Sequence, residues 1–283
     1  MSDQSIRRIR AGGARDDGPR PHAAGDLHAR VCTGSGQAVI VRAPADHLSA
    51  RSLQAVLFDL DGTLLDTVAD ISVALNRALA EQNLTNLPAA EVRVLIGRGV
   101  PTLIERALAR LGAAGESSDA TLLVERFHFH YERIHELDEI QSRVYPGVTA
   151  GLAELHALGL GLAVVTNKPK KAAVDLLTRL GLSQWIDVVV GGDTGAYRKP
   201  HPQPLLAACE ELEVRPAQAL MVGDSLTDVL AARAAGLAVV CVPYGYNEGA
   251  DPRALPCDAF VESVADLPAL LTAADSPFGA TAR

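Results

Sequence analysis

The stretch of sequence that decides the fold is Gln54-Ala55-Val56-Leu57-Phe58-Asp59-Leu60-Asp61-Gly62-Thr63. The apolar run at residues 55–58 predicts a short buried strand, and an acidic turn that contains glycine ends it. Asp59 and Asp61 are two residues apart, so at the end of a strand their side chains project to the same side. The stretch therefore predicts a buried strand with two converging carboxylates at its carboxyl end.

The chain that follows residue 145 alternates between apolar strand patterns and helical patterns, which predicts a doubly wound parallel sheet. We expect strands at residues 162–165, 188–190, 219–222 and 238–242, and helices at 171–180, 204–212 and 226–235. Between residues 67 and 145 apolar residues recur at helical spacing, and no strand pattern interrupts them. The sequence thus predicts a Rossmann-like α/β core, residues 51–66 and 146–272, with a helical cap inserted as residues 67–145.

The two ends of the chain lack this patterning. Residues 1–50 are rich in Arg, Gly, Ala, Asp and His, and show little helical or strand periodicity before residues 37–41. We expect a mostly disordered extension at residues 1–50 and a flexible tail at residues 273–283.

The composition limits the classes of partner. With 283 residues and a formal net charge of -8, the chain has no electrostatic footprint for a nucleic acid or an anionic membrane. A small phosphorylated metabolite remains compatible, because a few convergent donors and a metal can hold it. Cysteines without Cys-x-x-Cys pairing fit a reducing compartment, and no apolar run is long enough to span a bilayer. We expect a cytoplasmic monomer or homodimer.

Polar clusters directly follow the predicted strands, and ligands of an open α/β sheet bind at the carboxyl ends of its strands. A single Asp-x-Asp is often only a turn or a helix cap, but here several such clusters occur in order, each after an apolar strand. The clusters are Asp59 and Asp61; Thr166, Asn167 and Lys168; Arg198 and Lys199; and Asp224, Ser225 and Asp228.

These residue types suit phosphoryl transfer. Asp59, Asp61 and Asp224 offer the oxygen ligands that a hard cation such as Mg²⁺ prefers, and the cation can bridge to a phosphate. Thr166 and Asn167 open a helix, whose free N–H groups attract an anion. Lys199 supplies a full positive charge for a phosphoryl group that gains negative charge in the transition state.

The lysines are distributed unevenly. The chain has 26 Lys and Arg residues, but its lysines are confined to Lys168, Lys170, Lys171 and Lys199, all in two of the candidate site loops. This placement is what we expect if the site uses a compact ammonium and not the planar guanidinium of arginine. The alternative for the three in one turn is a solvated helix start.

Together these motifs resemble the four motifs of haloacid dehalogenase-type phosphatases, over about residues 54–270. The resemblance implies that Asp59 attacks phosphorus to form an aspartyl-phosphate and that Asp61 is the general acid and base. It also implies that the Asp61 backbone carbonyl, with Asp59 and Asp224, holds Mg²⁺. The remaining implied roles are phosphoryl binding by Thr166 and Asn167, charge compensation by Lys199, and support of the metal site by Asp228 from behind the ligands.

Within this family the chain is most similar to bacterial phosphoglycolate phosphatases. The similar segments are Ile96-Gly97-Arg98-Gly99, Lys199-Pro200-His201-Pro202 and Tyr244-Gly245-Tyr246-Asn247. The similarity implies 2-phosphoglycolate as the substrate, and it makes Gly97 and Arg98 candidates for binding the glycolate carboxylate. The alternative for Arg98 is a solvent-facing side chain in a loop.

Three other functions stay open on the sequence. Another capped phosphatase of the family, or a sugar-phosphate mutase similar to β-phosphoglucomutase, would use the same core motifs. A phospho-accepting receiver domain also gathers acidic residues and a lysine around Mg²⁺, but it needs no helical insertion.

Overall fold

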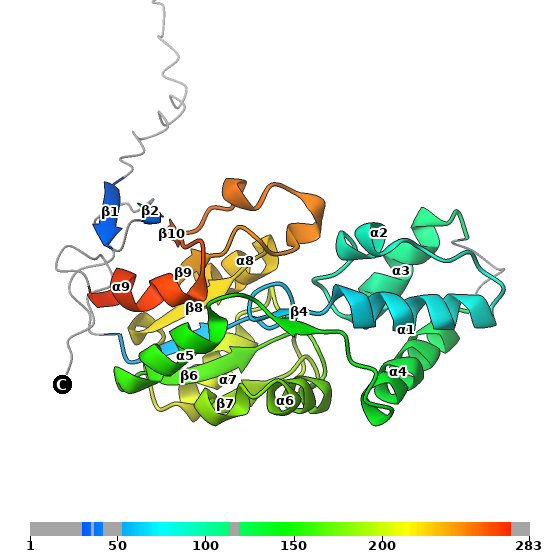
Figure 1. The fold of residues 1–283 in the computed structure, drawn as a ribbon, viewed down its shortest axis with the longest axis horizontal. Coiled ribbons are helices and arrows are strands. Elements are labelled where there is room, and N and C mark those ends of the chain that lie inside the picture. The colour runs from blue at the N-terminus through cyan, green and yellow to red at the C-terminus, as the bar shows by residue number, and fades with distance from the viewer. Residues whose placement is uncertain (1–29, 35–36, 42–52, 114–118, 273–283) are drawn as a thin grey trace, which may run out of the picture.

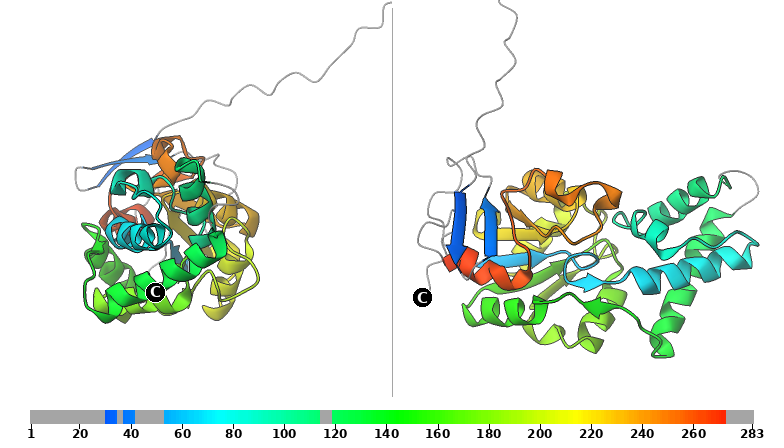
Figure 2. Two further views of the ribbon diagram at one scale, coloured as in Figure 1. Left: turned by 90° about the vertical axis from the view of Figure 1, so that its right-hand side faces the viewer. Right: turned by 45° about the horizontal axis from the view of Figure 1, so that its top comes forward.

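The structure, a computed structural model, describes residues 30–34, 37–41, 53–113 and 119–272, with residues 30–34 and 37–41 described by their backbone alone. Its described part forms two lobes, a sheet covered by helices and a smaller group of helices beyond one end of that sheet (Figure 1). The right-hand view of Figure 2 separates the same lobes. The α/β fold with an inserted helical cap is therefore confirmed.

The sheet of the core has the strand order β1-β2-β10-β9-β8-β3-β6-β7 in the described residues. Neighbouring strands from β10 to β7 run parallel, whereas β2 is antiparallel to β10 and β1 is antiparallel to β2. The strands are β1 (Arg30–Gly34), β2 (Gln37–Val41), β3 (Ala55–Phe58), β6 (Gly161–Val165), β7 (Val188–Val190), β8 (Ala219–Gly223), β9 (Ala238–Cys241) and β10 (Ala259–Phe260).

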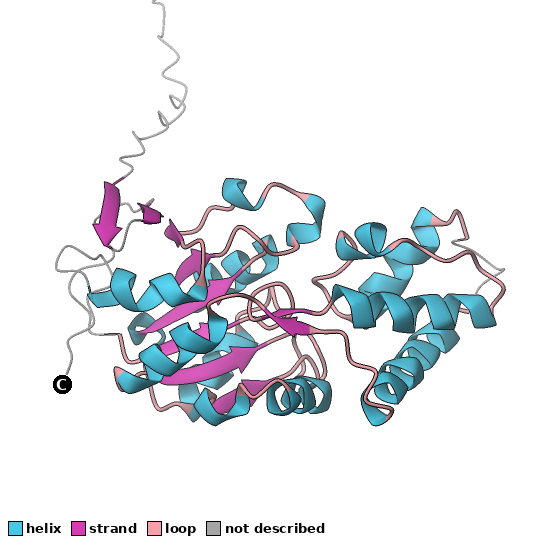
Figure 3. Cartoon of the chain, viewed as in Figure 1, coloured by secondary structure: helices cyan, strands magenta, loops and turns pink. Residues whose placement is uncertain are grey.

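Helices cover both faces of this sheet (Figure 3). Val56 and Phe58 of β3 face the helices α5 (Val148–Ala157), α6 (Lys170–Arg179) and α9 (Leu267–Thr272). Ala55 and Leu57 face the other side, toward α7 (Gln203–Glu211) and α8 (Leu226–Ala235). The uninterrupted apolar run of β3 follows from this burial on both faces. Short 3₁₀ turns lie at Ser183–Trp185, Pro216–Gln218, Asn247–Gly249, Pro252–Ala254 and Val264–Asp266.

The helical cap consists of α1 (Val68–Glu81), α2 (Ala89–Arg93), α3 (Val100–Arg110) and α4 (Ala120–Glu136). Its helices share one apolar cluster that includes Leu75, Leu79, Ile104 and Phe127. Residues at helical spacing in the sequence, such as Ile71 and Leu75, are buried in this cluster. The amphipathic pattern therefore indicated which faces of the helices pack against one another.

The chain enters and leaves the cap through a two-stranded ribbon, β4 (Leu65–Asp66) and β5 (Arg143–Val144). The two strands are antiparallel, and Asp66 pairs with Arg143. Both connections between core and cap therefore lie side by side.

Several features differ from the sequence-based expectations. The ribbon β4–β5 and the strand β10 were not predicted, because strands of two residues have no periodicity. Within the extension expected to be disordered, the backbone of residues 30–34 and 37–41 forms β1 and β2, and β2 pairs with β10. The rest of residues 1–50, apart from this hairpin, and the tail 273–283 lie outside the described residues. No helix in the part of the chain that the structure describes is long and apolar enough to cross a bilayer.

Candidate active site

The predicted polar clusters meet at the carboxyl edge of the sheet, below the helical cap. Asp59 follows β3, Thr166 follows β6, and Asp224 follows β8. A cavity of about 960 Å³ lies between this edge and the cap. Residues from both sides line it, among them Asp59, Asp61, Thr166 and Asn167 from the core and Ile71, Gly97, Phe127 and Tyr131 from the cap.

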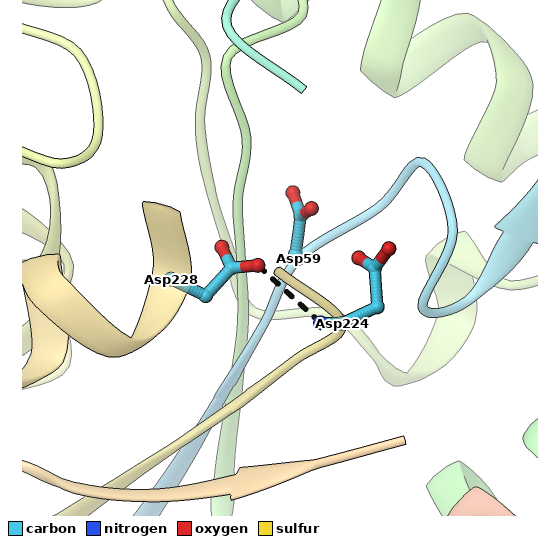
Figure 4. Close-up of side chains that lie close together, drawn as sticks. All are labelled: Asp59, Asp224 and Asp228. Carbon is cyan, nitrogen blue, oxygen red and sulfur yellow. Dashed lines mark hydrogen bonds between the residues drawn. The ribbon is translucent and has the colours of Figure 1, made fainter. Parts of the chain in front are cut away.

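Three carboxylates gather beside this cavity. Oxygens of Asp59, Asp224 and Asp228 all lie within 4.8 Å of one another (Figure 4), which makes them a group that could hold a metal ion. Burial and the neighbouring carboxylates raise the pKa of Asp59 to about 8, although Lys199 opposes the shift. Burial and Asp228 raise the pKa of Asp224 to about 7. A cation would relieve this repulsion, so the donor set fits a hard metal ion.

Asp228 is committed to supporting its neighbours. Its carboxylate accepts hydrogen bonds from the backbone N–H of Ser225 (3.1 Å) and of Asp224 (3.3 Å) and completes a capping box at the start of α8. It also accepts from the Lys199 Nζ at 2.7 Å. Asp228 thus holds the turn that presents Asp224.

Lys199 lies between two of the acids. Its Nζ is 2.8 Å from the Asp59 Oδ1 and 2.7 Å from the Asp228 Oδ1, and the residue is 4% exposed. Although burial lowers it, the pKa of Lys199 is raised on balance by Asp228 and Asp59. The ammonium therefore stays charged beside Asp59.

The Asp224 carboxylate is fixed from both sides. Its oxygens accept from the Thr63 Oγ1 at 3.0 Å and from the Tyr246 backbone N–H at 2.6 Å. Glycines leave the necessary room: a Cβ on Gly62 would lie 2.4 Å from the Asp224 Oδ2, and one on Gly245 would lie 2.1 Å from the Asp224 Cβ. Gly62 also has a φ of +94°, a conformation that favours glycine.

The Asp61 side chain is not part of the three-acid cluster and has other partners. Its Oδ1 accepts from the Thr67 Oγ1 at 2.6 Å, and its two oxygens lie 3.0 and 3.1 Å from the Lys168 Nζ. Of Asp61, the backbone carbonyl is thereby the group left for a metal. Sequence reasoning missed the pairing with Lys168, although the clustering of lysines in the site loops pointed to that residue.

Thr166 and Asn167 reach the cavity, but they use their side chains differently. Thr166 is buried, and its Oγ1 accepts from the Lys168 backbone N–H at 3.2 Å, so its O–H remains a donor. The Asn167 amide donates to the carbonyls of Gly97 and Lys199, both at 3.0 Å, and accepts from the Lys199 N–H at 2.9 Å. The Asn167 side chain therefore ties the cap to the Lys199 loop, and its backbone is what remains to contact a phosphoryl group.

The cap residues Gly97 and Arg98 differ in their position relative to the cavity. Gly97 lines the cavity, and its carbonyl accepts from Asn167. The Arg98 side chain is half exposed, and its Nε pairs with the Glu248 Oε1 at 2.7 Å on the core. Glu248 also pairs with Arg106, at 2.6 Å. The structure does not place Arg98 among the cavity residues, because a carboxylate of the core already binds its guanidinium.

The site combines an acidic cluster and a buried lysine at the carboxyl edge of a doubly wound sheet, and an inserted helical cap lies over it. This combination defines a class of phosphoryl-transfer hydrolase. The chain belongs to the haloacid dehalogenase-like hydrolases, whose family model matches residues 56–242.

Individual relatives are also similar to this chain. A phosphoglycolate phosphatase, plasmid, of Cupriavidus necator is 50% identical over 220 residues, which are 78% of this chain and 94% of the relative. A crystal structure of a predicted phosphoglycolate phosphatase from Haemophilus somnus has a TM-score of 0.71 and 35% identity, covering 76% of this chain and 96% of its own. A mutant of CbbY from Rhodobacter sphaeroides, in complex with xylulose-(1,5)bisphosphate, has a TM-score of 0.63 and 29% identity, covering 76% and 96%.

Proposed function

We propose that this chain is a Mg²⁺-dependent phosphatase that hydrolyses 2-phosphoglycolate to glycolate and phosphate. The observation that carries the proposal is the placement of Lys199 between Asp59 and Asp228, next to Asp224, where Asp59 lines a cavity shared by the core and the cap. The name of the Cupriavidus necator relative, which is 50% identical, supports this substrate.

Asp59 is the nucleophile in this proposal. One of its carboxylate oxygens attacks phosphorus, the ester P–O bond breaks, and an aspartyl-phosphate forms. Asp61 gives a proton to the departing alkoxide oxygen, which becomes the hydroxyl of glycolate. In the second half Asp61 takes a proton from a water molecule, whose oxygen attacks phosphorus and releases phosphate from Asp59.

The charges around phosphorus are met by fixed groups. Asp59, Asp224 and the Asp61 backbone carbonyl would hold Mg²⁺, which neutralises negative charge on the phosphoryl oxygens when it is bound. Lys199 adds its ammonium on the Asp59 side, and Asp228 keeps that ammonium in place. Thr166 and the backbone N–H groups of its loop donate to the phosphoryl oxygens.

The two lobes have different functions in this proposal. Residues 51–66 and 146–272 form the catalytic core, and residues 67–145 act as the cap that selects the leaving group and excludes water. A cytoplasmic location and a monomeric or homodimeric state remain predictions from the sequence.

A second candidate function is hydrolysis of a sugar phosphate. The cavity of about 960 Å³ is larger than a two-carbon acid needs, and the CbbY structure with xylulose-(1,5)bisphosphate supports this alternative.

A panel of phosphate monoesters in Mg²⁺ tests the proposal, with kcat/KM measured for 2-phosphoglycolate, ethyl phosphate and several sugar phosphates. We expect 2-phosphoglycolate to exceed each of the others by at least about tenfold, because a site built for a charged group rejects analogues without it. Chelation of the metal should abolish turnover. A sugar phosphate that ranks first would favour the second candidate, and hydrolysis of none of these esters would contradict both.

A further inference from the structure

A second buried lysine lines the cavity, and it pairs with Asp61 and not with the three-acid cluster. Lys168 follows β6, is 9% exposed, and lines the cavity wall. Its Nζ lies 3.0 and 3.1 Å from the two Asp61 oxygens and 4.9 Å from the centre of the Tyr131 ring. An ammonium has three N–H donors, and Asp61 is the side-chain carboxylate that it contacts among the described residues. A buried charge of this kind can take a further acceptor.

Tyr131 brings an unused donor to the same place from the cap. This residue of α4 is 5% exposed and lines the cavity, yet its buried O–H donates to no acceptor among the described residues. The Lys168 ammonium interacts with the oxygen of this hydroxyl and leaves its O–H available as a donor. The adjacent His135 ring, 4.7 Å away between ring centres, likewise has a buried Nε2 without a partner. Burial raises the pKa of Tyr131 to about 12, so its hydroxyl stays protonated and can donate. Buried polar groups are rarely left unpaired unless a ligand or water satisfies them.

The other cations of the cavity wall are engaged elsewhere or open to water. Lys171 has a side chain that is 86% exposed and is 3.1 Å from Glu132. Arg179 pairs with Asp175 and Asp138, and the Arg198 Nε donates to the Gly192 carbonyl at 2.7 Å. Of the lysines and arginines in the described part of this wall, Lys168 is therefore the buried one, and a desolvated cation binds an anion more strongly than an exposed one.

We propose that the Lys168 ammonium and the Tyr131 hydroxyl bind the carboxylate of the substrate, and that these two residues determine specificity in place of Arg98. This inference rests on the proposed function. In 2-phosphoglycolate the carboxylate carbon is two bonds beyond the ester oxygen, and in the proposed reaction Asp61 contacts that oxygen. The cation that pairs with Asp61 is thus beside the position where the carboxylate falls.

The arrangement lets Lys168 accept the substrate without releasing Asp61. Thr67, the residue before α1, donates its hydroxyl hydrogen bond to Asp61 over 2.6 Å. Asp61 therefore keeps this hydrogen bond when the Lys168 ammonium turns one N–H to the substrate. Lys168 belongs to the core and Tyr131 to the cap. A carboxylate held by both therefore bridges the two lobes over the reacting phosphoryl group.

The test is the ratio of kcat/KM for 2-phosphoglycolate to that for ethyl phosphate, which has the same ester chain with a methyl group in place of the carboxylate. Lys168→Met should lower this ratio by about 10- to 100-fold, the usual effect of losing a charged hydrogen bond. Tyr131→Phe retains the ring and should lower it by about 3- to 10-fold. Lys170→Met, which removes an exposed lysine outside the cavity wall, is the matched control and should leave the ratio unchanged.

The outcomes separate this inference from the proposed function. A wild-type enzyme without preference for 2-phosphoglycolate contradicts the proposed function and, with it, the inference. A wild-type preference that survives both Lys168→Met and Tyr131→Phe overturns the inference alone. Melting temperatures accompany the kinetics, and if Lys168→Met does not fold, Tyr131→Phe decides, because it keeps the ring and removes a hydroxyl that donates no hydrogen bond within the described protein.

Discussion

At the scale of single residues, the site depends on charges that stabilise one another. Lys199 is buried, and it is tolerated there because Asp59 and Asp228 both lie within 2.8 Å of its Nζ. Asp59 in turn has a raised pKa, because one ammonium shared with Asp228 does not offset its burial and the nearby Asp224. The nucleophile is thus held in an environment that favours binding of a further cation.

The first prediction concerns the nucleophile. Asp59→Asn should lower kcat for 2-phosphoglycolate by at least about a thousandfold, because an amide cannot form the aspartyl-phosphate. The metal-free variant should melt no lower than the wild type at pH 8, since it lacks a buried charge next to Asp224. Steady-state kinetics and calorimetry check both points, with the exposed Asp251→Asn as control. Retained turnover would exclude Asp59 as the nucleophile.

Most individual core residues of the site could be predicted from the sequence. Asp59, Thr166, Lys199 and Asp224 come after successive apolar strands or their loops, and parallel strands bring their carboxyl ends to one edge. The direction of Arg98 could not be predicted, because it depends on how a cap loop meets a core loop far along the chain. The partners of the Asn167 side chain could not be predicted either, because its amide hydrogen-bonds to backbone groups of distant loops.

At the scale of elements, the loop after β9 connects the metal-binding edge to the cap. The Tyr246 N–H binds Asp224, and two residues later Glu248 binds Arg98 and Arg106. Asn247 and Glu248 have φ angles of 37° and 50°, a left-handed conformation that is uncommon for residues other than glycine. Surrounding contacts hold the loop in this conformation, among them the bonds from Arg93 of α2 to the carbonyls of Tyr244 and Gly245, both at 2.8 Å.

Glu248→Gln removes the charge that pairs with both arginines of the cap. We expect kcat/KM for 2-phosphoglycolate to fall by about 3- to 10-fold, because partly exposed ion pairs are each worth about 1 kcal/mol or less. The matched control is Glu262→Gln, which breaks an exposed arginine pair within the core and should leave kcat/KM unchanged. Equal effects of the two variants would show that the contacts of Glu248 with the cap do not contribute to catalysis.

The longer helices and strands could be predicted from the sequence, whereas the strands of two residues could not. Helix α8 begins at Leu226 and ends before Gly236, where the expected glycine has a φ of 77°. Helix α6 begins at Lys170, one residue earlier than the expected range, with Pro169 before its first residue. The expectation that Thr166 and Asn167 open this helix was wrong, since both lie in the loop that precedes it. The ribbon β4–β5 depends on pairing across the whole cap, so no local pattern reveals it.

At the scale of the whole molecule, the raised pKa values of Asp59 and Asp224 make stability depend on pH and on metal. The folded-state pKa values of about 8 and about 7 lie above the ordinary value of 3.8. Between about pH 4 and pH 8 the metal-free folded protein therefore binds more protons than the unfolded chain, and its stability falls as pH rises. His128, whose pKa burial lowers, opposes this trend over the lower part of the window.

We therefore expect the melting temperature of the metal-free protein to be higher at pH 5.5 than at pH 8.5 by about 3 °C or more. Saturating Mg²⁺ should raise the melting temperature more at pH 8.5, because metal binds the ionised carboxylates. Differential scanning calorimetry at both pH values, with Asp59→Asn as control, checks this. The melting temperature of this variant should depend less on pH than that of the wild type, because the contribution of the Asp59 carboxyl group is removed. A melting temperature that rises with pH in the metal-free wild type would contradict the prediction.

The ribbon β4–β5 has a consequence for how such an enzyme can change during evolution. Because Asp66 pairs directly with Arg143, the chain leaves the core and returns to it at neighbouring positions (Figure 1). A tight hairpin turn could close that gap, so the intervening helices can be exchanged, lengthened or lost while every strand of the sheet keeps its neighbours. Selection can then alter which leaving group is admitted without rebuilding the chemistry at Asp59.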